Sequence, residues 1–186
     1  EGILSLSGNG SLISFGGYRT AVGGAVNTTT DRAVGTLDLS GNVNTSTPTL
    51  TSVTAGQALR SVATQDGTAF WLSVAGTYGV RYNSGAGGAS TLIDSRNGRQ
   101  VAIAANELFG SNGSTAIANK LQSYGVPPTT ATAPTNVIAQ ATADAIHGFM
   151  MLDLDASVVG ADTAYAFNTV TNTLLKYSKV GGVWTS

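Results

Sequence analysis

Short runs of alternating apolar and polar residues, separated by turns rich in glycine and asparagine, dominate the chain. The clearest pair occupies residues 3–7 and 11–15, on either side of the turn Gly8-Asn9-Gly10. Alternation with a period of two is typical of half-buried strands, and an Asn-Gly turn between two such runs indicates a hairpin. The same pattern recurs along the chain, which predicts about a dozen short antiparallel strands.

One stretch departs from this alternation. Residues 136–146 are rich in alanine, which permits a helix, although the Thr and Val residues among them disfavour it. They follow a segment rich in Thr, Pro and Ala at residues 125–135. We expect this segment to be an irregular excursion, followed at most by one helix, in an otherwise all-β protein.

A loose repeat predicts the fold class. Three strands open with Arg60-Ser61-Val62, Arg99-Gln100-Val101 and His147-Gly148-Phe149, and the openers are 39 and 48 residues apart (99 − 60 and 147 − 99). A turn and an aromatic-centred strand follow each opener. Repeats of roughly 40 to 50 residues built from short antiparallel strands are typical of propeller blades. Residues 1–186 are therefore predicted to form a single all-β domain, a β-propeller of about four blades, with Trp71 and Phe109 buried between sheets.

About four blades is the lower end of the four to eight that closed propellers usually have, so the ring is either unusually small or incomplete, and we expect it to be incomplete. The chain begins within an alternating run and ends at Val183-Trp184-Thr185-Ser186, where another strand is expected to begin. A partial ring exposes an unpaired strand edge and an uncovered sheet face. We therefore expect residues 1–15 and 165–184 to contact other polypeptide, either remaining blades of the same protein or other subunits.

Composition points to the cell exterior. Charged residues make up 10% of the chain, against about 25% in an average soluble domain. Low charge with abundant Thr, Ser and Asn is typical of exported surface layers, fibres and adhesins, which predicts an extracellular or cell-surface location. The net charge is −1 and the nine basic residues are scattered, so nucleic acid is excluded as a partner. No apolar run has the roughly 20 residues that a membrane span needs.

Local motifs suggest two kinds of site, one for glycosylation and one for a metal ion. N-x-[ST] sequons occur at Asn9, Asn27, Asn44 and Asn112, each in a stretch expected to be an exposed turn. They are candidate glycan acceptors, and the alternative is chance in a chain rich in Asn, Ser and Thr.

Asp153, Asp155 and Asp162 are candidate calcium ligands, but the central Gly and closing Glu of a helical calcium loop are missing. The alternative there is a solvated turn, and no other cofactor is expected.

Enzymatic chemistry has little support in the residue inventory. His147 is the only histidine, and a hydrogen-bonded strand histidine is the alternative to a catalytic base. Glu1 and Glu107 are the only glutamates, which disfavours paired acids for glycoside hydrolysis. Four aromatic residues could stack on sugars or instead pack between blades, namely Trp71, Tyr78, Tyr82 and Trp184. A carbohydrate-binding propeller is therefore the main alternative function, ahead of a polysaccharide hydrolase or lyase.

Several segments resemble uncharacterised secreted β-propeller-like repeat proteins of bacteria and algae. They are residues 1–7 (EGILSLS), 32–38 (RAVGTLD), 68–72 (TAFWL), 79–82 (GVRY) and 174–178 (LLKYS). The resemblance implies a larger ring with at least one further blade, and it implies no catalytic residues. The expected function is a non-catalytic structural or adhesive module of a cell-surface or filamentous assembly.

Overall fold

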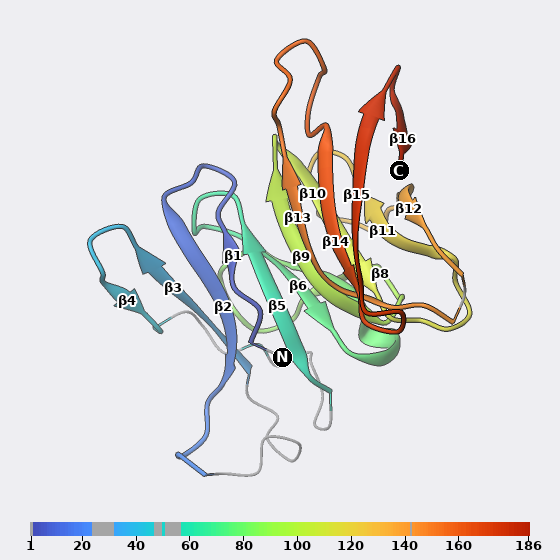
Figure 1. The fold of residues 1–186 in the computed structure, drawn as a ribbon. Coiled ribbons are helices and arrows are strands. Elements are labelled where there is room, and N and C mark those ends of the chain that lie inside the picture. Colours follow the sequence, from blue (N-terminus) through green and yellow to red (C-terminus); the bar gives the residue numbers. More distant parts are fainter. Residues whose placement is uncertain (1, 24–31, 47–49, 51–56, 142) are drawn as a thin grey trace.

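The computed structural model describes residues 2–23, 32–46, 50, 57–141 and 143–186. These residues form sixteen strands in four antiparallel sheets of four strands each (Figure 1). The 3-10 helix η1 (Gly76–Tyr78) is the only helical element in this part of the chain. The prediction of an all-β protein is confirmed.

Each sheet contains four consecutive strands. Sheet 1 consists of β1 (Ser5–Leu6), β2 (Leu12–Tyr18), β3 (Arg32–Asp38) and β4 (Val43–Asn44). Sheet 2 consists of β5 (Leu59–Thr64), β6 (Phe70–Val74), β7 (Val80–Asn83) and β8 (Thr91–Asp94). Sheet 3 consists of β9 (Gly98–Ala104), β10 (Glu107–Asn112), β11 (Asn119–Ser123) and β12 (Thr135–Ala139). Sheet 4 consists of β13 (Ile146–Leu152), β14 (Thr163–Asn168), β15 (Thr173–Val180) and β16 (Val183–Thr185).

Within every sheet, each strand pairs with the next strand along the chain, so all four sheets are simple up-and-down meanders. Tight turns make this order possible. Ala105 and Asn106 join β9 to β10 with positive φ angles of 47° and 60°. Gly181 and Gly182 join β15 to β16 in the same way, with φ angles of 57° and 83°. Two-residue turns with positive φ match the twist of paired strands, and glycine adopts them without steric cost.

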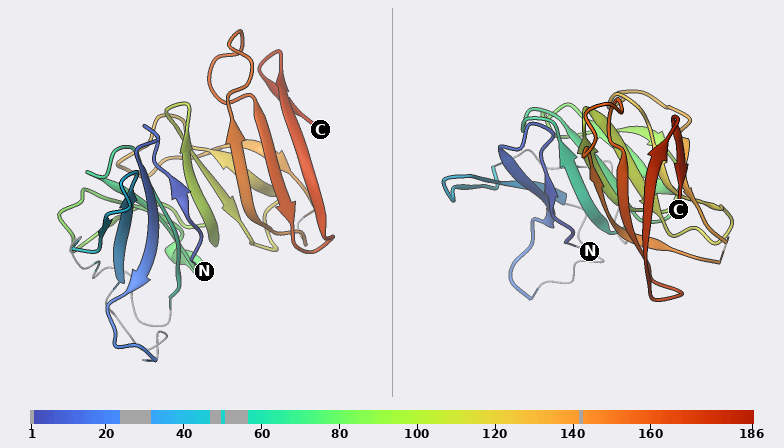
Figure 2. Two further views of the ribbon diagram at one scale, coloured as in Figure 1. Left: turned by 60° about the vertical axis from the view of Figure 1, so that its left-hand side comes forward. Right: turned by 45° about the horizontal axis from the view of Figure 1, so that its top comes forward.

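The sheets pack face to face in chain order, with an apolar core between each pair (Figures 1 and 2). Val34 of sheet 1 packs with Leu72 of sheet 2 in the first core. Trp71, which is 6% exposed, lies in the core between sheets 2 and 3. Phe109 is 0% exposed and lies in the core between sheets 3 and 4. The predicted burial of these two aromatic residues between sheets is confirmed.

The first strands of neighbouring sheets are linked by side-chain hydrogen bonds. The Val101 amide of β9 donates to Ser61 Oγ of β5 at 2.7 Å, and the Phe149 amide of β13 donates to Gln100 Oε1 of β9 at 2.8 Å. Ser61 and Gln100 are the second residues of two predicted repeat openers. The repeat therefore corresponds to the first strands of sheets 2, 3 and 4, and the arrangement is consistent with a β-propeller-like fold.

The helix that the alanines of residues 136–146 permit does not form. Within residues 136–146, the structure has strand β12, and its Val137 and Ile138 are buried in the core between sheets 3 and 4. β-Branched residues pack well on a pleated surface and lose rotamer freedom in a helix. Burial of these two residues therefore outweighs the helix propensity of the neighbouring alanines.

Candidate functional site

An open groove runs between the first strands of sheets 1, 3 and 4. Its volume is about 500 Å³, and most of its lining side chains are apolar, including Leu6, Ile103 and Met150. Its polar groups hold the structure together, since Ser5 Oγ donates to the Val101 carbonyl at 2.8 Å and Gln100 accepts from Phe149. Asp153 is the only carboxylate among the lining residues. The groove therefore lacks the pair of acids that glycoside hydrolysis uses.

His147 lies on β13 and is half-buried. Burial, together with the positive charges of Arg99 and Arg60, lowers the pKa of its imidazole, so the ring is neutral at pH 7. A catalytic triad places a carboxylate beside the histidine to orient it and stabilise its charged form. The charged side chains that act on His147 are instead two cations, an arrangement that disfavours its protonation.

The three candidate calcium ligands do not converge. Both carboxylate oxygens of Asp162 accept hydrogen bonds, Oδ2 from the amides of Leu154 and Asp155 at 2.8 and 2.7 Å, and Oδ1 from Thr163 Oγ1 at 2.7 Å. The amide of Asp155 and the hydroxyl of Thr163 lower the pKa of Asp162. Among the described residues, no three acidic or histidine side chains are placed to hold a metal ion. Asp153, Asp155 and Asp162 therefore do not form such a cluster, and Asp162 instead holds the loop in place.

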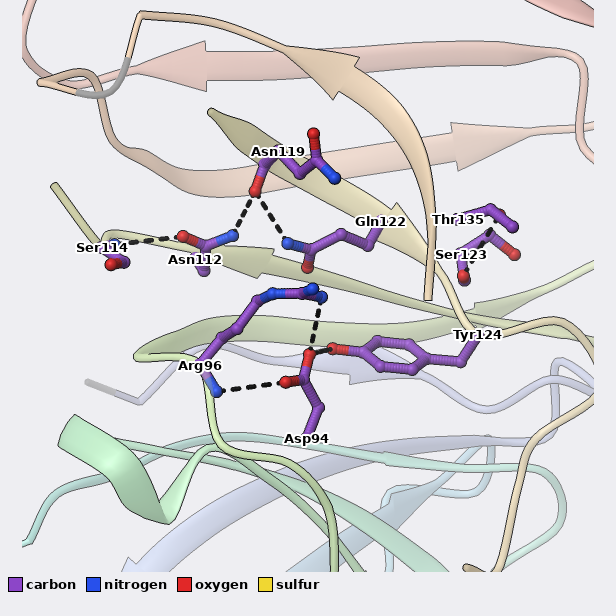
Figure 3. Close-up of polar contacts among 9 residues, drawn as sticks. All are labelled: Asp94, Arg96, Asn112, Ser114, Asn119, Gln122, Ser123, Tyr124 and Thr135. Carbon is purple, nitrogen blue, oxygen red and sulfur yellow. Dashed lines mark hydrogen bonds and ion pairs between the residues drawn. The ribbon is translucent and has the colours of Figure 1, made fainter. Parts of the chain in front are cut away.

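The four sequons differ in exposure. Asn9 and Asn44 are exposed, as predicted, while Asn27 lies outside the described residues. Asn112 is buried: its side-chain amide donates to the Asn119 carbonyl, and its Oδ1 accepts from the Ser114 amide at 3.1 Å (Figure 3). The predicted exposure of Asn112 is wrong, because this side chain closes the loop between β10 and β11.

A common turn geometry explains the two exposed sequons. In each case, the side-chain oxygen of an Asn or Asp accepts hydrogen bonds from both the amide and the hydroxyl two residues later. Four pairs share it: Asn9–Ser11, Asn44–Ser46, Asp66–Thr68 and Asp155–Ser157. The hydrogen bonds lower the pKa of Asp66 and of Asp155. Because Asp serves as well as Asn, the pattern has a role in turn formation that does not depend on glycosylation.

The four aromatic candidates for sugar stacking lie in different places. Trp71 is buried, donates from Nε1 to the Pro128 carbonyl at 2.7 Å, and has its ring centroid 5.4 Å from that of Tyr82. Tyr78 packs against the core between sheets 1 and 2, whereas Trp184 packs against the core between sheets 3 and 4. The four rings therefore do not form a single exposed stacking surface.

A buried polar cluster joins sheets 2 and 3. Tyr124 Oη donates to Asp94 Oδ2 at 2.8 Å, and Arg96 Nη1 lies 2.9 Å from the same oxygen (Figure 3). Burial, followed by the negative charge of Asp94, raises the pKa of the Tyr124 hydroxyl. The hydroxyl stays protonated and acts as a donor, so this cluster fixes the contact between the two sheets.

Sheet 1 has an apolar face that no sheet of the described chain covers, here called free face 1. Leu6, Ile13, Leu37 and Val43 lie opposite one another in a row across its four strands. Leu6 is 58% exposed and Val43 is exposed to a similar degree. The other side of the sheet faces sheet 2, where Ser14 Oγ donates to the Val62 carbonyl at 2.8 Å. Ile13 and Leu37, between them, are half-buried. An aliphatic row with exposed residues at both ends is typical of a contact surface.

Sheet 4 has a second such face, here called free face 4. Its rows are Met150–Tyr165–Lys176 and Gly148–Phe167–Leu174. Met150 is 58% exposed and Leu174 is 69% exposed. Alternate residues of the same strands, such as Phe149 and Ala166, are buried against sheet 3.

The register shows that free face 4 is equivalent to buried faces elsewhere in the chain. Three cross-strand rows correspond: Ala63–Trp71–Tyr82, Ala102–Phe109–Ser123 and Met150–Tyr165–Lys176. The first residues of the three rows occupy the same place in the repeat. Each lies two positions after the second residue of its opener, which is Ser61, Gln100 or Gly148. The first two rows face the next sheet, and their central aromatic residues are buried. Tyr165 occupies the same position without a sheet over it.

Sequence reasoning predicted contacts at both ends of the chain but did not identify these two faces. A signal for one of them is present in Phe149-Met150-Met151-Leu152, four consecutive apolar residues on β13. Because neighbouring residues of a strand point to opposite sides, such a run is typical of a strand covered on both faces.

Comparisons with known proteins identify no family for this chain. No protein-family model matches the chain, and no curated protein matches it. The resemblance to secreted propeller-like proteins therefore stays a prediction. In the described ranges, no helix has both the length and the apolar character needed to cross a bilayer.

Proposed function

We propose that this chain is a non-catalytic structural module of an extracellular or cell-surface assembly, which binds further β-sheets through free faces 1 and 4. The observation that supports the proposal most strongly is the equivalence of Tyr165 to Trp71 and Phe109. In sheets 2 and 3, this position is buried against a following sheet, while in sheet 4 it lies on an exposed apolar face. A sheet face that carries residues of this kind, and that has no sheet over it, favours binding of another sheet.

The physical driving force is burial of apolar surface. Each square ångström of apolar surface removed from water contributes about 25 cal/mol, before the entropy cost of association. The row on free face 1 has no charged residue, and the two rows on free face 4 have one, Lys176. Docking on these rows therefore carries little cost for desolvating charge. In a propeller, such docking would continue the ring beyond the four sheets.

Hydroxyl-radical footprinting tests this proposal, because methionine and phenylalanine side chains are oxidised when water reaches them. We expect Met150 and Phe167 to be oxidised in the dilute isolated chain and protected in the native surface fraction. Val126, exposed in the loop between β11 and β12 of sheet 3 and so on neither face, should react equally in the two samples. Met151 is buried against sheet 3 and should be protected in both.

Equal oxidation of Met150 in the two samples would contradict the proposal. A glycan-binding screen separates it from the carbohydrate-binding alternative. Sugar binding that is lost in Tyr78→Ala or Tyr82→Ala, but retained when free face 4 is altered, would favour the alternative.

A further inference from the structure

We infer that the sheet bound by each free face belongs to a second copy of this chain, with free face 4 of one copy packed on free face 1 of the next. This inference rests on the proposed function and specifies its partner. It is a head-to-tail contact, in which two different surfaces of the same molecule meet.

The contacts between sheets inside the chain have a direction. Sheets 2 and 3 each present a row with a central aromatic residue, Trp71 or Phe109, to the sheet that follows. The following sheet contacts this aromatic row with its other face, the one opposite to its own corresponding row. We call the first kind of face presenting and the second kind receiving. With four sheets in order, one presenting face and one receiving face are left over. These are free face 4, with Tyr165, and free face 1.

The chemistry of the two leftover faces matches that of the buried contacts. Trp71 shares a core with Val101, Ile103 and Leu108 of sheet 3, so these strands receive it mainly with aliphatic side chains, beside Tyr124. The row on free face 1 is aliphatic as well, from Leu6 to Val43. An aromatic presenting row and an aliphatic receiving row are therefore available on every copy.

Charge does not oppose the contact. The Lys176 ammonium lies 5.9 Å from the centroid of the Tyr165 ring, so its charge has a partner on its own sheet. The aliphatic row of free face 1 offers no cation to repel it. A contact between unlike surfaces extends from copy to copy, either closing into a ring or continuing as a filament.

Variants that block one face each provide the test. Leu6→Lys with Val43→Lys blocks free face 1, and Met150→Lys with Leu174→Lys blocks free face 4. All four side chains are largely exposed, so we expect both variants to fold, as checked by far-UV circular dichroism and thermal unfolding. Val126→Lys is the matched control, because it adds the same charge at an exposed aliphatic residue in the loop between β11 and β12 of sheet 3, outside both faces.

Light scattering coupled to size-exclusion chromatography gives the readout. The unsubstituted chain and the Val126→Lys control should exceed the monomer mass of 18.7 kDa at micromolar concentration, and their mass should rise with concentration. Each blocked variant alone should be a monomer. An equimolar mixture of the two blocked variants should form a pair with one copy of each, because one intact contact remains between them.

Three results would overturn the inference. An unsubstituted chain that stays monomeric at every concentration removes the second copy as the partner. A blocked variant that still pairs with itself shows a contact between like faces instead. A mixture that stays monomeric shows that the two faces do not bind each other. If the chain is monomeric but footprinting still shows Met150 protected in the native fraction, another protein covers the face and the proposed function stands.

Discussion

Truncating Phe109 and Phe167 to alanine compares a covered sheet face with an uncovered one. Both residues are phenylalanines on the second strand of their sheets, β10 and β14. Phe109 is 0% exposed in the core between sheets 3 and 4, whereas Phe167 is 43% exposed on free face 4. The pair therefore differs mainly in whether another sheet lies over the ring.

The expected magnitudes follow from burial. Removing a fully buried phenylalanine ring loses its transfer free energy and leaves a cavity, at a combined cost of about 3 to 5 kcal/mol. Phe109→Ala should therefore lower the Tm by roughly 6 to 20 °C, at about 2 to 4 °C per kcal/mol for a chain of this size. Phe167→Ala should cost about 1 kcal/mol or less, because much of its ring already contacts water.

Urea unfolding of the dilute monomer measures both free energies. Tryptophan fluorescence follows the sheet contacts, since Trp71 lies between sheets 2 and 3 and Trp184 packs on the core between sheets 3 and 4. Far-UV circular dichroism follows the strands, and coincident transitions indicate two-state unfolding. Equal destabilisation by the two substitutions would refute the assignment of free face 4 as uncovered. A cost below about 1 kcal/mol for Phe109→Ala would refute the packing of sheet 3 on sheet 4.

Three further predictions concern the polar sites. The pKa of Tyr124 is raised above its ordinary value of 10.0, so only the unfolded chain ionises this residue near that pH. The contribution of Tyr124 to stability should therefore be constant below about pH 10 and fall as the pH rises past it. The urea midpoint of Tyr124→Phe should lack this alkaline decline, and an unchanged decline would contradict the role of the cluster. Millimolar calcium should leave the Tm unchanged, and a calcium-dependent rise in Tm would restore the metal site. Asp162→Ala should lower the Tm more than Asp153→Ala, because Asp162 accepts hydrogen bonds from its own loop. In folded protein secreted from a eukaryotic host, peptide mass mapping should find glycan on Asn9 and Asn44 but not on buried Asn112, and glycan on Asn112 would contradict its placement.

Local patterns in the sequence were sufficient for the all-β class and for most of the strands, about a dozen expected where the described residues form sixteen. The hairpin around Gly8-Asn9-Gly10 and the repeat that opens at Arg60, Arg99 and His147 both appear in the structure as predicted. They could be predicted because alternation, turn residues and repeat length act over a few neighbouring residues. Strand β12 was not predicted, because burial of Val137 and Ile138 outweighed the helix propensity of the neighbouring alanines.

Exposure and site geometry depended on the tertiary structure. Asn112 and Asn9 have the same sequon, yet one is buried by its loop and the other is exposed. Tyr165 and Trp71 hold equivalent positions in their sheets, yet only Trp71 has a following sheet over it. The direction in which a strand residue points is set by the local backbone. What lies over that residue is set by the packing of sheets whose residues are far apart along the chain.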